Sequence, residues 1–166
     1  MPTYEPACLN NLKTGDQIAV KGNVVDLNPF LLPFMLHTNG EYFHHGILDK
    51  ERMEVIDFHE DNKFSAKPKR RSISEFLAGR CQLYRVIHEE CLPVEKTMEM
   101  ANDAVQPGSF YPAYNLLLNN CETFATYLKT GNKRSAQASQ AVLNFLLFIM
   151  LLLEVYVMYR ARRYNQ

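Results

Sequence analysis

The distribution of apolar residues divides the chain near Gly131. Before this point, apolar residues are dispersed among charges and turn signals. After it, the polar segment 132–140 leads into the apolar run AVLNFLLFIMLLLEVYVMY, residues 141–159. This run is close to the ~20 residues that a helix needs to cross a hydrocarbon core. We therefore expect a globular domain over residues 1–131, a linker over 132–140 and a C-terminal transmembrane anchor over 141–159.

The residues around this run fit a membrane anchor. Tyrosines suit an interfacial belt and arginines a charged stop, and the run ends with both: Tyr156, Tyr159, Arg160, Arg162 and Arg163. A buried helix, or one lying in the interface, is the alternative. Basic residues flank both ends, so charge does not decide the orientation. An anchor at this place in the chain predicts insertion after synthesis, as a single pass in an intracellular membrane with the domain facing the cytosol.

Within the globular part, alternating apolar positions predict strands. EYFHHGIL (41–48) and MEVIDF (53–58) alternate well enough to pair across the turn DKER, and CQLYRVIHEEC (81–91) predicts a further strand. LKTGDQIAV (12–20) reads as a turn leading into a short strand. We expect these strands to form an antiparallel sheet.

Two segments have the 3.6-residue periodicity of helices. LPVEKTMEMANDAV (92–105) is amphipathic, and NNCETFATYLKTG (119–131) carries a capping residue, Asn119 or Asn120, and a terminal Gly131. With the strands, these helices indicate an α+β fold.

Two other segments are expected to be loops. NPFLLPFML (28–36) holds two prolines, which argue against a central strand or helix, so it either covers the core or dips into a bilayer. KPKRR (67–71) is expected to be a basic loop that an anchor would hold near an anionic leaflet.

Composition excludes several classes of function. Lys and Arg number 18, as do Asp and Glu, so no overall field draws the chain to nucleic acid. The four cysteines form neither a CxxC pair nor a CxxC…HxxxH pattern, which argues against a structural zinc site. No basic-then-apolar leader begins the sequence, which predicts a reducing compartment and free thiols.

One cysteine falls where a nucleophile would be expected. Cys121 occupies the first turn of the predicted helix 119–131. There the free backbone N–H groups and the positive end of the helix dipole stabilise a thiolate and can receive an oxyanion. Cys8, Cys81 and Cys91 have no such placement, so Cys121 is the candidate nucleophile.

A histidine is needed as the base. Of the five histidines, His44 and His45 lie in a predicted strand and must point to opposite faces, so that only one can meet Cys121. A third polar group would fix the imidazole tautomer. Asp57 and His59 share one face of the next strand, and either could serve.

The sequence blocks around these residues resemble those of a known family. HHGIL (44–48), VIDF (55–58) and NNCETFATYLKTG (119–131) are similar to the three signature blocks of the lecithin:retinol acyltransferase-like family, which includes the H-Ras-like suppressor phospholipase/acyltransferases. LKTGD (12–16) is similar to its opening motif, and the resemblance covers about Leu12 to Tyr159. The family has a permuted papain-like core of the NlpC type, so the resemblance implies an antiparallel sheet packed on the cysteine-bearing helix.

The resemblance also implies site roles. It makes Cys121 the nucleophile and His44 the general base, while Asn120 and Glu122 match residues that support the start of the helix. The family's second histidine falls on Asp57, with His59 two residues further on. Thr123 stands where the family has another histidine. These two departures put the level of activity in question.

The implied activity is that of a membrane-tethered thiol phospholipase A/acyltransferase without cofactors. Cys121 would take an acyl chain from a membrane glycerophospholipid as a thioester and pass it to water, an amine or an alcohol. Two other readings stay open: a membrane-anchored thiol peptidase or isopeptidase of the same fold, and a non-catalytic membrane-anchored binding module.

Overall fold

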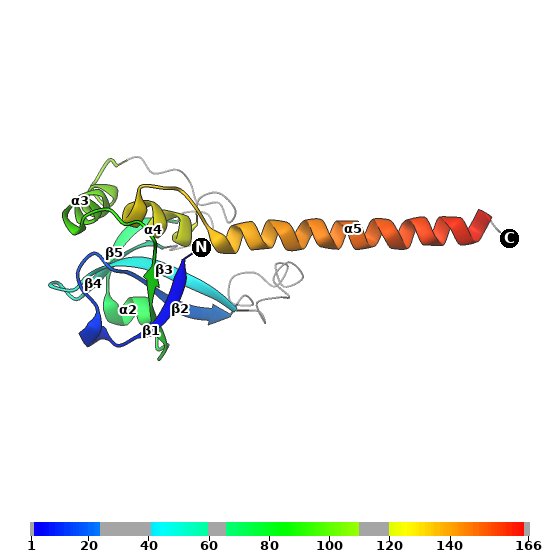
Figure 1. Cartoon of the computed structure of the whole chain (residues 1–166). Coiled ribbons are helices and arrows are strands. Elements are labelled where there is room, and N and C mark those ends of the chain that lie inside the picture. The colour runs from blue at the N-terminus through cyan, green and yellow to red at the C-terminus, as the bar shows by residue number, and fades with distance from the viewer. Residues whose placement is uncertain (1, 24–40, 60–65, 110–119, 165–166) are drawn as a thin grey trace.

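The computed structural model describes residues 2–23, 41–59, 66–109 and 120–164. Its centre is a six-stranded sheet in the order β1-β6-β2-β3-β4-β5, with antiparallel pairing between all neighbours in the described sheet (Figure 1). The strands are β1 (Thr3–Ala7), β2 (Gln17–Asn23), β3 (Glu41–Asp49), β4 (Glu54–His59), β5 (Lys67–Ser72) and β6 (Leu83–Ile87). The predicted α+β class and its antiparallel sheet are confirmed.

Helices cover both faces of this sheet (Figure 1). The described helices are η1 (Leu9–Asn11, a short 3-10 turn), α2 (Ile73–Leu77), α3 (Val94–Ala104), α4 (Cys121–Thr130) and α5 (Ala136–Tyr164), of which α5 does not cover the sheet. The helix α4 packs on one face, where Phe124 and Leu128 meet Ile47 and Ile56. The opposite face is closed by Phe76 of α2. Because successive residues of a strand point to opposite faces, β3 contributes alternate residues to each of these two cores.

Local signals explain where α4 begins and ends. The Asn120 side chain caps its first turn by accepting a hydrogen bond from the Thr123 N–H at 2.8 Å. At its C-terminus, Gly131 adopts a φ of 78°, a left-handed conformation that glycine accepts without strain. Asn120 is therefore the N-cap, and the alternative Asn119 lies outside the described residues.

The expectation of a basic loop at residues 67–71 was wrong, because this segment forms the edge strand β5. Pro68 is tolerated there since an edge strand can spare a hydrogen-bond donor. The charges are also less available than expected. Arg70 Nη1 lies 3.0 Å from both Asp49 and Glu54.

The structure adds one strand to those predicted and shortens another. The first residues of the chain form β1, whose register pairs Thr3 with Ile87 of β6. The strand predicted at residues 81–91 is shorter and spans only Leu83–Ile87. The proline-containing segment 28–36 lies outside the described residues.

The C-terminal helix α5 extends away from the domain as a single long rod (Figure 1). It begins at Ala136, so it includes residues that the sequence suggested were linker. Its stretch from Ala138 to Arg163, 26 residues, is long and apolar enough to cross a membrane. Almost all of the described side chains along this stretch are exposed.

Gly46 of β3 has no room for a side chain against β4. It pairs with Asp57, and a Cβ at this position would overlap Val55 Cγ1 and lie 3.2 Å from Asp57 Cβ. Both neighbours are fully buried, so neither can move aside freely.

The substitution Gly46→Ala is therefore expected to lower the free energy of unfolding by about 1–3 kcal/mol, as overpacking of a core does. Urea denaturation of the full chain in detergent micelles measures this. The control is Gly22→Ala in β2, where the added Cβ meets only the Tyr42 side chain, which can rotate away. Equal, small effects of the two substitutions would contradict the close-packing account.

Candidate active site

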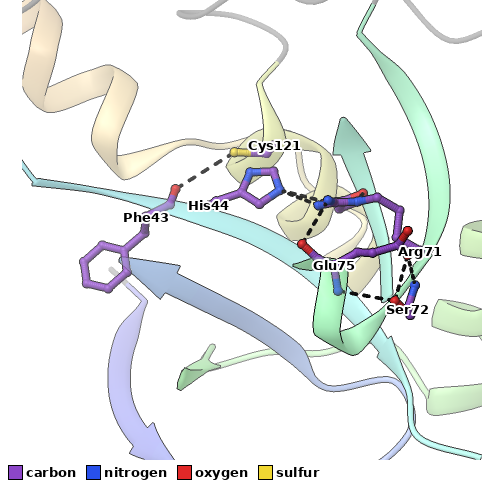
Figure 2. A network of polar contacts seen from close by, with 7 residues as sticks. Phe43, His44, Arg71, Ser72, Glu75 and Cys121 are labelled. Atoms are coloured by element: carbon purple, nitrogen blue, oxygen red, sulfur yellow. Dashed lines mark hydrogen bonds and ion pairs between the residues drawn. The ribbon is translucent and has the colours of Figure 1, made fainter. Parts of the chain in front are cut away.

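Cys121 is the first residue of α4 and lies against β3. It is 8% exposed, whereas Cys8, Cys81 and Cys91 are exposed to solvent. Its Sγ lies 3.9 Å from the Phe43 carbonyl oxygen (Figure 2). The thiol therefore sits at the N-terminus of a capped helix, at the margin of the core and beside the strand that carries the tandem histidines.

His44 of β3 lies between Cys121 and a carboxylate. The Cys121 side chain is near enough to raise the pKa of this ring, and His44 Nε2 lies 2.7 Å from Asp57 Oδ2. Because Nε2 is bonded to Asp57, Nδ1 is the ring nitrogen left for the thiol. The register that pairs Gly46 with Asp57 places His44 diagonally across from this carboxylate, on the same face of the sheet.

Asp57 is held from its other side by Arg71 of β5. Arg71 Nε lies 3.2 Å from Asp57 Oδ1, and Arg71 Nη2 contacts Oδ2. The same Nη2 is 3.4 Å from His44 Nε2. Figure 2 shows Cys121 and Arg71 on opposite sides of the His44 ring. The four side chains thus form one continuous polar chain.

Neighbouring charges and hydrogen bonds explain the protonation states of Asp57 and His44. Burial by itself raises the pKa of the Asp57 carboxyl, but hydrogen bonds and charges from His44 and Arg71 outweigh it and hold the pKa below its ordinary value. Asp57 is therefore ionised although its side chain is fully buried.

The same interactions act on His44 in the opposite direction. Burial lowers the pKa of His44, but the negative charge of Cys121, the hydrogen bonds to Asp57 and Cys121, and the charge of Asp57 together raise it to about 9. At neutral pH the ring is therefore an imidazolium placed between a sulfur and a carboxylate.

His45 points to the other face of the sheet, as alternation in a strand requires. It is fully buried, with Nδ1 3.2 Å from Gln17 Nε2 and Nε2 3.5 Å from the Tyr4 hydroxyl. Burial, with the charge of His44 and of His88, lowers the pKa of His45 to about 3, so this ring is neutral. Its ring nitrogens lie beside Gln17 and Tyr4, so it is a structural neighbour of the site.

The residues on either side of Cys121 are also buried. Asn120 caps α4, and the Glu122 carboxylate is 1% exposed and accepts hydrogen bonds from Ser135 and Ala136. Thr123, which stands where the resembling family has a histidine, is buried in the first turn. His59 ends β4, but its side chain lies outside the described residues.

Sequence reasoning missed two groups of this site. The sequence pattern places Arg71 in a basic loop near the membrane surface, and the Phe43 carbonyl carries no sequence signal at all. A signal for Arg71 was present: Ser72 and Glu75 form a capping box, which marks the start of a helix directly after residue 71. Arg71 directly precedes that boundary, so it belongs to the end of β5, and this strand pairs with the strand that bears Asp57.

Among the described residues, no group of three or more His, Cys, Asp or Glu side chains is arranged to hold a metal ion. The chemistry that these residues support is nucleophilic, with a thiol, a base and an orienting carboxylate in contact.

Comparison with known proteins agrees with this arrangement. The family model described as lecithin retinol acyltransferase matches residues 10–134, which include all of the polar chain from His44 to Cys121. No curated protein and no solved structure gives a significant match. The matched family has an NlpC/P60-like fold, in keeping with the antiparallel sheet and cysteine-bearing helix seen here. It implies acyltransferase or hydrolase activity in general. This chain belongs to the lecithin retinol acyltransferase family.

Proposed function

We propose that this protein is a membrane-tethered thiol phospholipase A/acyltransferase that carries the acyl chain as a thioester on Cys121. The observation that supports this most strongly is the His44 ring, which is held at 2.7 Å by the buried Asp57 carboxylate and is near enough to Cys121 for that side chain to raise its pKa. A thiol, a base and an orienting acid in hydrogen-bonded order are the parts that acyl transfer through cysteine requires.

The first half-reaction transfers the acyl group to sulfur. The Cys121 thiolate attacks the carbonyl carbon of a glycerophospholipid ester, and the carbonyl oxygen becomes an oxyanion that backbone N–H groups at the start of α4 can receive. The carbon–oxygen ester bond then breaks. The His44 imidazolium gives its proton to the departing lyso-lipid oxygen, which leaves an acyl-thioester and a neutral imidazole.

The second half-reaction releases the acyl group. Neutral His44 takes a proton from water, an amine or an alcohol as that acceptor attacks the thioester carbonyl. The carbon–sulfur bond breaks, and the thiolate–imidazolium pair is restored. Water as the acceptor gives phospholipase A activity, and an amine or alcohol gives acyltransferase activity.

Asp57 supports both steps by holding His44 in one tautomer and orientation. The resembling family has a histidine at this place, whereas an aspartate binds an imidazolium more strongly than a neutral histidine does. Arg71 accompanies this change, because a fully buried carboxylate needs a second partner. The departure at Asp57 therefore comes with its own compensating charge.

The helix α5 supports the membrane part of the proposal. Its length and apolar composition suit a single membrane pass. We propose that the domain faces the cytosol, as expected for an anchor at this place in the chain. Such an anchor would keep the site beside the bilayer and so raise the local concentration of phospholipid.

The direct test is intact mass spectrometry of the full chain in phosphatidylcholine vesicles that have been washed with alkaline carbonate. We expect the chain to remain in the vesicles and to gain the mass of one acyl chain, in an adduct that hydroxylamine removes. Cys121→Ala should give no adduct, because the thioester cannot form.

Other outcomes of this test favour other functions. If no acyl adduct forms but Cys121 alkylates rapidly, the lipid substrate is contradicted and a peptide substrate is favoured. If no acyl adduct forms and Cys121 alkylates no faster than Cys81, catalysis is contradicted altogether and a binding module is favoured.

A second prediction concerns pH. The rate of thioester formation should fall at high pH as His44 loses its proton, with a midpoint near its pKa of about 9. Asp57→Asn removes a carboxylate that raises this pKa, so the alkaline limb should move to lower pH, toward the ordinary value of 6.5. We also expect the maximal rate to fall roughly 10²-fold or more, since the tautomer is no longer fixed.

The matched control for this variant is Asp49→Asn. Asp49 is also a buried aspartate paired with an arginine, Arg70, but it lies on the other face of the sheet. It should leave the alkaline limb in place. A limb that moves equally in both variants, or in neither, would contradict the role given to Asp57.

A further inference from the structure

The first residue before α5 is bonded to both neighbours of Cys121. The Ser135 hydroxyl donates to Glu122 Oε2 at 2.5 Å and accepts from Asn120 Nδ2 at 3.3 Å. Ser135 is buried, with 9% of its surface exposed. A side chain outside α4 thus touches the residues on either side of the sulfur-bearing residue.

Ser135 is also the N-cap of α5. Its Oγ accepts a hydrogen bond from the Ala138 N–H at 3.0 Å, which satisfies a donor in the first turn of the helix. The next residue adds a parallel link, because the Ala136 N–H donates to Glu122 Oε1 at 3.1 Å. The start of α5 and the start of α4 therefore share one hydrogen-bonded cluster.

Glu122 is the centre of this cluster. It is 1% exposed, and besides Ser135 and Ala136 it accepts from the Tyr4 hydroxyl of β1 at 3.4 Å. Burial, followed by the charge of Glu122, raises the pKa of Tyr4, so this phenol keeps its proton and stays a donor. A buried carboxylate depends on such donors, since removing one leaves charge that neither water nor protein compensates.

This arrangement exceeds what a helix cap needs. Ser72, the N-cap of α2, exchanges hydrogen bonds with Glu75 of its own helix. Ser135 instead binds a carboxylate thirteen residues earlier, in another helix. The acidic partner therefore does more than satisfy α5: it joins α5 to the turn that holds Cys121.

We propose that Ser135 is a positioning residue that couples the membrane helix α5 to the first turn of α4, so that the seating of the anchor fixes Cys121 against His44. The inference rests on the proposed function of Cys121 as the nucleophile. It makes α5 a rigid extension of the active site, in place of a flexible tether. The bilayer then sets the direction from which an ester reaches the sulfur.

The coupling has a measurable consequence for the thiol itself. Without the Ser135 hydroxyl, Glu122 loses its shortest hydrogen bond and the turn 120–122 is free to shift. A displacement of about 1 Å between reacting groups can lower a rate about 10²-fold. The Cys121–His44 contact should weaken with it, so both alkylation and acyl transfer should slow.

The experiment compares variants of the full chain in phosphatidylcholine vesicles. The main variant is Ser135→Gly, because glycine is an accepted N-cap and α5 should still begin at residue 136. Ser135→Thr keeps a hydroxyl and serves as the rescue. Ser139→Ala is the matched control, since the Ser139 hydroxyl bonds the Ser135 carbonyl within α5 and does not belong to the Glu122 cluster.

Two readouts are taken for each variant. The first is the rate of iodoacetamide alkylation of Cys121 against pH, resolved at the peptide level from Cys8, Cys81 and Cys91. The second is kcat and KM for release of fatty acid from the vesicles.

We expect Ser135→Gly to alkylate at least about fivefold more slowly at neutral pH, with an altered pH profile. Its kcat should fall tenfold or more at nearly constant KM. Ser135→Thr should recover most of both values, and Ser139→Ala should match the wild type. A Ser135→Gly chain with wild-type alkylation overturns the coupling, whether or not lipid is hydrolysed.

The two proposals fail in distinguishable ways. If the wild type hydrolyses no lipid while Ser135→Gly still loses Cys121 reactivity, the coupling stands and the lipid substrate is wrong. If Ser135→Gly and Ser139→Ala slow alkylation equally, the effect belongs to α5 stability and the coupling is wrong.

Discussion

The buried ion pair between Asp57 and His44 is the interaction on which the rest of the site depends. Asp57 has no exposed side-chain surface, so its charge must be balanced inside the protein, and His44 and Arg71 do this from opposite sides. The charge of Cys121, together with the hydrogen bond to Asp57 and the charge of Asp57, keeps the imidazole protonated. Because Gly46 has no side chain, β3 and β4 can pair closely enough to bring His44 and Asp57 together.

This arrangement offers a physical reason for the unusual residue at position 57. A histidine there could accept one hydrogen bond from His44 and remain neutral. An aspartate is charged, and it has been accommodated by an arginine from the edge strand β5. Two strands thus supply the charges of the network, and Arg71 belongs with Asp57 in any description of the site.

Much of the fold was readable from the sequence because its signals are local. The pairing of β3 with β4 follows from alternation, and the limits of α4 follow from Asn120 and Gly131. What could not be read depends on contacts between distant segments. From the sequence alone, Arg71 would be expected on the surface. The pairing of β5 with β4 brings it to Asp57. Ser135 looks like linker until Glu122, thirteen residues earlier, is found beside it. Sequence pattern places residues on faces, but only the packed sheet decides which faces meet.

The central claim is that His44 is an imidazolium held between Cys121 and Asp57. The most direct measurement is an NMR titration of the full chain in detergent micelles, with labelled histidines and the His44 signal assigned by its loss in His44→Gln. We expect this ring to stay protonated through neutral pH and to titrate near 9, and we expect Cys121→Ala to move its pKa to a lower value. A wild-type His44 that titrates near 6.5, unmoved by Cys121→Ala, would contradict it.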